Sequence, residues 1–429
     1  MLSSLRPQTL FLLRRAFLIA LSLFAVGLAL RFIPILFDTL NTHPYDGKVD
    51  WLAARAFLAH ENPYSPELLA RNKLDGLGHP PTTSFWFLPL AHLDLQMMSR
   101  VLGHLSVFLL LFTIYLTLDE LELPMALPVA CVLALLILYT HWMRFHLHLA
   151  QISQLISFLF LLMWLALRRD EEVLGGVFLG AICTLKLFPG MLALFLLFQR
   201  RLRVVITAGV VYLSVAALMT SRFGLVAWPQ FLKSEKVIVD FWIGNMRNAS
   251  LHGVVLRAFH PVCVQQAGAK WYATAIATAI GVVLFALCVY LYYRLPEERK
   301  RETLFRTDIP CSLLLMLGVF CNPFVYEHYQ ALTVVPLLVA LYAIWKCNRG
   351  GILSLRLSLI ALGLIAALLV PMFYEPWRFL GVMAFRQLGM HYAVHALELW
   401  NASIFPFIVA VFVLILVAAG RKPAAAAAS

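Results

Sequence analysis

Long apolar runs separated by short polar intervals make up most of this chain. The runs lie near 15–37, 96–117, 125–143, 151–167, 204–220, 273–293, 310–324, 329–345, 353–373 and 400–419. An α-helix needs roughly 20 such residues to cross a bilayer. The pattern therefore predicts an all-α polytopic membrane protein, a bundle of about 10–12 transmembrane helices in a single domain over residues 1–429.

The composition supports this class. Hydrophobic residues make up 62% of the chain and charged residues 13%, with a mean hydropathy of +0.84, whereas soluble domains have about 45–50% and about 25%. The 34 Lys and Arg exceed the 22 Asp and Glu, which could suggest nucleic acid, but the basic residues cluster between apolar runs. Such clusters determine membrane topology, so we expect no nucleic-acid partner.

The basic clusters orient the chain. The positive-inside rule predicts that all of them lie in the cytoplasm together with both termini. The clusters are Arg168/Arg169, Arg200 to Arg203, Arg294 to Arg306, Lys346/Arg349 and Arg421/Lys422. No small-residue cleavage site follows the first run, which is therefore a retained span. Segment 173–198 is basic at both ends, so it is expected to form a hairpin with Lys186 near its tip. Gly175, Gly176, Gly180 and Pro189 favour that turn; one kinked span is the alternative.

Under this topology the polar segments gather on the external face, chiefly in loops 38–95 and 221–272. Apolar residues at helical spacing from Asp50 to His60 predict an amphipathic helix along the membrane surface. Ionisable residues beside or within spans usually serve chemistry or transport rather than packing. Lys186 and Arg257 fall in apolar surroundings and are functional candidates for that reason.

Several short motifs follow one another in a recognisable order. Asp46-x-x-Val49-Asp50-Trp51-x-Ala53-Ala54 precedes Asn62-Pro63-Tyr64 and the Pro80-Pro81 pair; then come Ala150-Gln151-Ile152-Ser153, Leu185-Lys186-x-x-Pro189, Arg247-Asn248-x-Ser250 with Arg257, and Asn322-Pro323-x-x-x-x-His328. Together they resemble glycosyltransferase family 87 of the GT-C superfamily, which implies a GT-C-like bundle. The chain departs from the family pattern at Ala150, where Gly is usual, at Ser153, where Asn is usual, and at His79, where an aromatic residue commonly precedes the prolines.

The resemblance implies transfer of a sugar from a polyprenyl-phosphate donor. Such a reaction needs a carboxylate to accept the acceptor's proton, cations to hold the departing phosphate, and an apolar groove for the lipid. We expect inverting transfer of a mannose-like hexose or a pentose to a hydroxyl of a lipid or glycan acceptor. The expected location is the extracytoplasmic side of the inner (plasma) membrane, with membrane lipids as further partners and no metal or other cofactor.

Two aspartates are candidates for the base. Asp46 before Gly47 is commonly a turn residue, and Asp50 is an acid of the kind favoured near a helix N-terminus. The resemblance favours Asp46 as the catalytic base, with Asp50 second.

A second group of residues is expected to bind the donor and its phosphate: His328, Lys186, Arg257, Asn248, Gln151, His79, Glu327 and Arg247. Lys186, Arg257 and His328 would hold the phosphate itself. A lone histidine at the start of a span is more often only interfacial, so that alternative stays open for His328.

The sequence leaves alternative functions open. His141, His146 and His148 lack both the i, i+4 spacing and the acidic partner that would favour a metal site. A lipid-linked sugar transporter or flippase would also use a buried lysine and an acidic loop, but transporters usually contain internal repeats, and no long repeat is evident. A GT-C protein O-glycosyltransferase or ligase would differ only in its acceptor.

Overall fold

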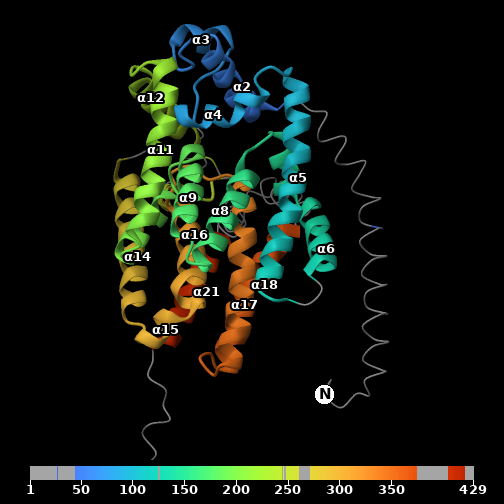
Figure 1. The fold of residues 1–429 in the computed structure, drawn as a ribbon, viewed down its shortest axis with the longest axis vertical. Coiled ribbons are helices and arrows are strands. Elements are labelled where there is room, and N and C mark those ends of the chain that lie inside the picture. Colours follow the sequence, from blue (N-terminus) through green and yellow to red (C-terminus); the bar gives the residue numbers. More distant parts are fainter. Residues whose placement is uncertain are drawn as a thin grey trace, which may run out of the picture.

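The computed structural model describes residues 44–123, 126–243, 245, 248–259, 271–373 and 404–420, together with Gly27. Within these residues every regular element is a helix (Figure 1). The first predicted span is outside them apart from Gly27, as are Arg247, the predicted external loop 374–399 and the last basic pair, Arg421/Lys422. The all-α prediction is confirmed for the described part of the chain.

Five helices in the described ranges are long and apolar enough to cross a membrane: α5 (Leu95–Glu120), α11 (Leu202–Phe223), α14 (Trp271–Tyr293), η4 with α16 (Leu304–Asp308 and Ile309–Cys321), and η5 with α17 (Glu327–Thr333 and Val334–Arg349). A sixth is obtained if α6 (Ala126–Leu138) and α7 (His141–His148), bent by 75°, count as one span. Further apolar helices pack in the same bundle: α8 (Ser153–Arg168), α9 (Glu172–Leu185), α10 (Gly190–Phe198), α18 (Leu355–Phe373) and α21 (Ile404–Ala419).

Segment 172–201 is a hairpin, as predicted. Helix α9 ends at Leu185, the chain is extended at Lys186, and α10 returns along the bundle. The two ends meet again, because the Arg201 guanidinium lies 2.9 Å from an Asp170 carboxylate oxygen and 3.3 Å from Glu172. Lys186 is therefore at the end of the bundle opposite this ion-pair cluster.

Glycines on α9 have a different role from the one expected. A Cβ atom at Gly176 would lie 2.6 Å from the Val204 carbonyl oxygen, and one at Gly180 would lie 2.7 Å from the Ala208 oxygen. These glycines permit close packing of α9 on α11 rather than the turn itself. The turn falls later, at Lys186 to Pro189.

Basic residues from three of the predicted clusters, Arg168, Arg201 and Arg306, meet at one end of the bundle. Arg168 lies 3.2 Å from Glu120 at the end of α5 and 3.3 Å from Asp308 at the start of α16. Arg306 pairs with Asp170 at 2.9 Å. The short helix α15 (Glu297–Arg301) lies at this same end (Figure 1). The predicted clustering of charges on one side is thus present in the packing.

The opposite end carries a layer that we call the cap, at the top of Figure 1: α2 (Tyr45–Leu58), α3 (Pro66–Arg71), η2 (Pro81–Thr83), α4 (Ser84–Phe87), η3 (Leu88–Leu90) and α12 (Ala227–Trp242). The helix predicted near Asp50 to His60 is α2, which begins five residues earlier. Trp51 packs into the main core and its Nε1 donates to the Leu93 carbonyl at 3.1 Å. The rings of Phe57 and Phe223 of α11 pack edge to face, so apolar contacts fix the cap on the bundle.

Candidate active site

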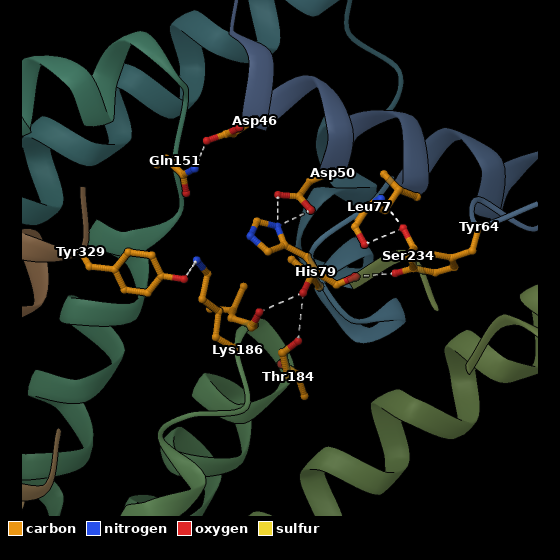
Figure 2. A network of polar contacts seen from close by, with 12 residues as sticks. Asp46, Asp50, Tyr64, Leu77, His79, Gln151, Thr184, Lys186, Ser234 and Tyr329 are labelled. Carbon is orange, nitrogen blue, oxygen red and sulfur yellow. Dashed lines mark hydrogen bonds and ion pairs between the residues drawn. The ribbon is translucent and has the colours of Figure 1, made fainter. Parts of the chain in front are cut away.

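A cavity of about 700 Å³ lies between the cap and the bundle. Its walls come from α2, the segment before η2, the end of α7, the break between α9 and α10, α12, and the turn before η5. Five residues predicted from the sequence line it: Asp46, His79, Gln151, Lys186 and His328. Residues far apart in the chain thus meet in one chamber, as Figure 2 shows for four of them.

A close backbone contact places Asp46. The Gly47 N–H donates to the Leu149 carbonyl at 2.9 Å, and a Cβ at Gly47 would lie only 2.7 Å from the Ala150 Cβ. Glycine is needed for this approach. It brings the Asp46 carboxylate within hydrogen-bond reach of Gln151, whose Nε2 donates to it (Figure 2). Asp46 lies in the first helical turn of α2 rather than in a loop turn.

Burial gives Asp46 the character of a base. Burial raises the pKa of this carboxyl above its ordinary value, while the Gln151 hydrogen bond and the charges of His79 and Lys186 lower the pKa again. A carboxylate that has lost hydration accepts a proton more readily. The arrangement suits proton abstraction from a hydroxyl that enters the cavity.

Lys186 occupies the break between α9 and α10. The Thr83 hydroxyl donates to the Leu185 carbonyl at 2.9 Å and so ties the end of α9 to the cap. The Lys186 side chain is 6% exposed, and its Nζ donates to the Tyr329 hydroxyl at 2.6 Å and lies 4.1 Å from the centre of the Tyr329 ring. A buried ammonium with one neutral partner retains donors for an anion.

Asp50 is placed differently from Asp46. Its carboxylate is 4% exposed and does not line the cavity; both oxygens contact His79 Nδ1, at 2.8 and 2.9 Å. The two aspartates, one helical turn apart on α2, therefore have separate surroundings. Asp46 faces the chamber, and Asp50 faces a histidine that itself faces the chamber.

His328 lies in η5 with its side chain 4% exposed. The centre of its ring is 4.7 Å from that of Tyr329. The ring also stacks parallel to that of Tyr326, with 6.4 Å between the ring centres. Among the described residues its Nδ1 has no hydrogen-bond partner. The ring is thus held by aromatic contacts, and its polar atoms remain for a ligand. Glu327 is the first residue of η5, and its side chain is outside the described part of the structure.

Two predicted donor-site residues lie away from this cavity. The Asn248 side chain is fully buried and donates to the Ile243 and Pro323 carbonyls at 3.1 and 3.0 Å, while its oxygen accepts from the Ser250 and Val325 N–H groups. It joins two loops and has little capacity left for a sugar. Arg257 donates to the Asn245 carbonyl at 3.0 Å and does not line the chamber. Neither is retained in the proposed site.

Sequence reasoning missed Glu235 and Tyr329, which both line the cavity. Burial raises the pKa of Glu235, and the nearby His79 lowers it. Glu235 belongs to the sequence Lys233-Ser234-Glu235-Lys236, which resembles a solvated helix face. The tertiary contacts show that this face turns inward. The Ser234 hydroxyl accepts from the Leu77 N–H at 2.6 Å and donates to the Leu77 carbonyl at 3.1 Å.

The remaining wall is apolar and partly open. Leu187, Val237 and Phe241 line the cavity with 50%, 52% and 51% of their side-chain surface exposed. Large exposed apolar side chains at a cavity mouth favour contact with lipid. Among the described residues no group of three or more His, Cys, Asp or Glu side chains is placed to hold a metal ion. The chamber thus combines a carboxylate, a cation and an apolar opening.

The model of glycosyltransferase family 87 matches residues 78–323, more than half of the chain. The match includes His79, Gln151 and Lys186, starts after Asp46 and Asp50, and ends before His328. Comparisons with curated proteins and with solved structures gave no match. On the extent of the family match, the chain belongs to glycosyltransferase family 87 and is a membrane glycosyltransferase.

Proposed function

We propose that this protein transfers a mannose-like hexose or a pentose from a polyprenyl-phosphate donor to a hydroxyl of a lipid or glycan acceptor. One observation supports this proposal most strongly. A half-buried carboxylate, Asp46, shares a chamber with a buried ammonium, Lys186, and the chamber opens through an apolar mouth. These are the groups that such a transfer requires.

The proposed step is a displacement at the anomeric carbon. The acceptor hydroxyl gives its proton to the Asp46 carboxylate while its oxygen bonds to that carbon. The bond from the anomeric carbon to the phosphate oxygen breaks, and its electron pair leaves with the polyprenyl phosphate. Attack opposite the leaving group inverts the configuration. Positive charge that develops on the sugar ring favours a nearby carboxylate, as in other glycosyl transfer.

The departing phosphate is proposed to bind near Lys186 and His328. Preorganised donors stabilise charge that develops on a leaving group. The lipid chain would pass the exposed side chains Leu187, Val237 and Phe241. The cavity lies at the end of the bundle opposite the basic clusters, so the positive-inside rule supports an extracytoplasmic site and cytoplasmic basic ends.

Purified protein in detergent can test the proposal with synthetic farnesyl-phosphate mannose and farnesyl-phosphate arabinose as donors and an alkyl glycoside as acceptor. The expected products are free farnesyl phosphate and a glycosylated acceptor of inverted anomeric configuration, detected by chromatography and NMR. Asp46→Asn should reduce transfer by about 10²–10⁴. Wild-type rates in Asp46→Asn would exclude the carboxylate-base mechanism.

The transporter alternative predicts a different result in the same system. Protein reconstituted into vesicles would move intact donor across the bilayer without releasing farnesyl phosphate, and Asp46→Asn would leave that movement intact. Peptide acceptors can be added to the transfer assay to test the remaining alternative. A protein O-glycosyltransferase or ligase would glycosylate the peptide rather than the alkyl glycoside.

A further inference from the structure

Asp50 and His79 form a closely held pair beside the cavity. His79 Nδ1 is 2.8 and 2.9 Å from the two Asp50 oxygens. Asp50 is 4% exposed, whereas His79 lines the chamber. Figure 2 shows the other ring nitrogen, Nε2, turned toward the space between Gln151 and Lys186. The histidine thus stands between a buried carboxylate and the place where a substrate would bind.

Backbone contacts fix the position of His79 independently of Asp50. The His79 carbonyl accepts from the Tyr64 hydroxyl at 2.6 Å. Two residues earlier, Leu77 is bound through its N–H and its carbonyl to the Ser234 hydroxyl of α12. Pro80 follows and restricts the backbone further. The backbone contacts leave the orientation of the imidazole ring open, and the Asp50 carboxylate fixes that orientation.

The pair has a definite hydrogen-bond polarity. A carboxylate only accepts, so Nδ1 must donate to Asp50, and Nε2 is the atom presented to the cavity. A buried carboxylate is costly unless a positive partner compensates it. Among the described residues His79 is the hydrogen-bond partner of the Asp50 side chain. A ring that carries a proton on each nitrogen would direct its Nε2–H into the chamber.

We infer that Asp50 is a positioning residue that acts through His79, and that His79 donates from Nε2 to the phosphate of the polyprenyl donor. This inference rests on the proposed function and adds a role to it. His79 would meet the phosphate from the cap side, and Lys186 would meet it from the α9–α10 break. Asp50 does not serve as a second base, because its oxygens are occupied and lie outside the chamber.

The two roles for Asp50 differ in what they do to product binding. A base contributes to the rate of transfer and not to the binding of polyprenyl phosphate. A carboxylate that orients a phosphate ligand contributes to that binding, and only while the histidine is present. Farnesyl phosphate, the product of the assay above, is therefore the probe.

Isothermal titration calorimetry of purified full-length protein with farnesyl phosphate tests the inference. His79→Gln should weaken binding roughly tenfold to a hundredfold, the effect of losing one charge-assisted hydrogen bond. Asp50→Asn keeps an acceptor oxygen for Nδ1 and removes the charge, so binding should also weaken. The double variant should bind no worse than His79→Gln alone. Asp119→Asn, exposed at the end of α5, is the matched control and should bind like wild type.

Several results overturn the inference. Wild-type affinity in Asp50→Asn or in His79→Gln does so, and so does a further loss of transfer rate when Asp50→Asn is added to His79→Gln. If Asp50→Asn unfolds, as thermal melting would reveal, His79→Gln still decides the phosphate contact. Failure of the wild-type protein to bind farnesyl phosphate would instead refute the proposed function, and with it the inference.

Discussion

Replacing Lys186 by methionine separates its charge from its packing. Methionine retains an unbranched apolar side chain beside the Tyr329 ring but has no ammonium. In the folded protein Lys186 Nζ donates to the Tyr329 hydroxyl at 2.6 Å. Tyr329 lines the cavity, so we expect water to satisfy its hydroxyl after the substitution. We therefore expect a folded protein with a specific defect in donor use.

The size of the defect follows from the environment of the ammonium. Lys186 is 6% exposed, so solvent screens its contact with a phosphate little. A hydrogen bond to a charged group contributes roughly 1.5–3 kcal/mol. At about 1.4 kcal/mol per factor of ten, the KM for the donor should rise roughly tenfold to 150-fold. Lys186→Arg should also be poor, because a planar guanidinium and a compact ammonium occupy different spaces.

Initial rates measured over a range of farnesyl-phosphate mannose concentrations give the KM. Lys233→Met, an exposed lysine on α12, is the control for removal of a positive charge near the cavity. Tyr329→Phe keeps the aromatic ring under the ammonium and should change the KM far less than Lys186→Met. Wild-type donor kinetics in Lys186→Met would remove this residue from the phosphate site and would refute the reasoning.

Four further predictions concern Asp46, Ala150 and topology. Burial raises the folded-state pKa of the Asp46 carboxyl. The contribution of this carboxyl to stability is therefore greatest below its unfolded-state pKa and is lost as pH rises through its folded-state pKa. Asp46→Asn should thus melt at or above the wild-type temperature at pH 7, and a lower melting temperature would contradict this. Transfer should fall on acidification at a higher pH than an ordinary carboxyl would give, measured as kcat/KM against pH. Ala150 has a φ of 51°, so Ala150→Gly should stabilise by about 0.5–1 kcal/mol in chemical denaturation, and destabilisation would argue against strain there. Cysteines at the exposed positions Tyr45 and Leu225 should react with a membrane-impermeant reagent from one side and a cysteine at Leu355 from the other; labelling of Tyr45 and Leu225 from opposite sides would contradict the arrangement.

The sequence contained strong signals for the spans and for isolated charges. Apolar runs have few structural alternatives, and a lysine within one must find a polar setting, so Lys186 could be predicted as a site residue. The hairpin was predictable for a similar reason, because basic residues at both ends of 173–198 require a return of the chain.

Pairwise side-chain geometry could not be predicted. Asp50 and His79 are 29 positions apart in the chain, and no spacing rule relates a helix to a distant loop. Asn248 has the amide of a sugar-binding residue, yet the same amide joins two loops, and composition does not distinguish these uses. Glu235 was hidden among exposed lysines, because its inward direction depends on the tertiary contact of Ser234.

The length of α9 also indicates how deep Lys186 lies in the membrane. Helix α9 has 14 residues and, at 1.5 Å per residue, rises about 21 Å from the ion pairs at its base to Lys186. A bilayer core is about 30 Å thick. A phosphate at Lys186 is thus expected below the level of the neighbouring lipid headgroups, and the acceptor must descend to meet it. We expect such a descent to select acceptors by shape: a hydroxyl on a slender or lipid-anchored molecule would reach the bottom, and one on the surface of a bulky folded protein would not.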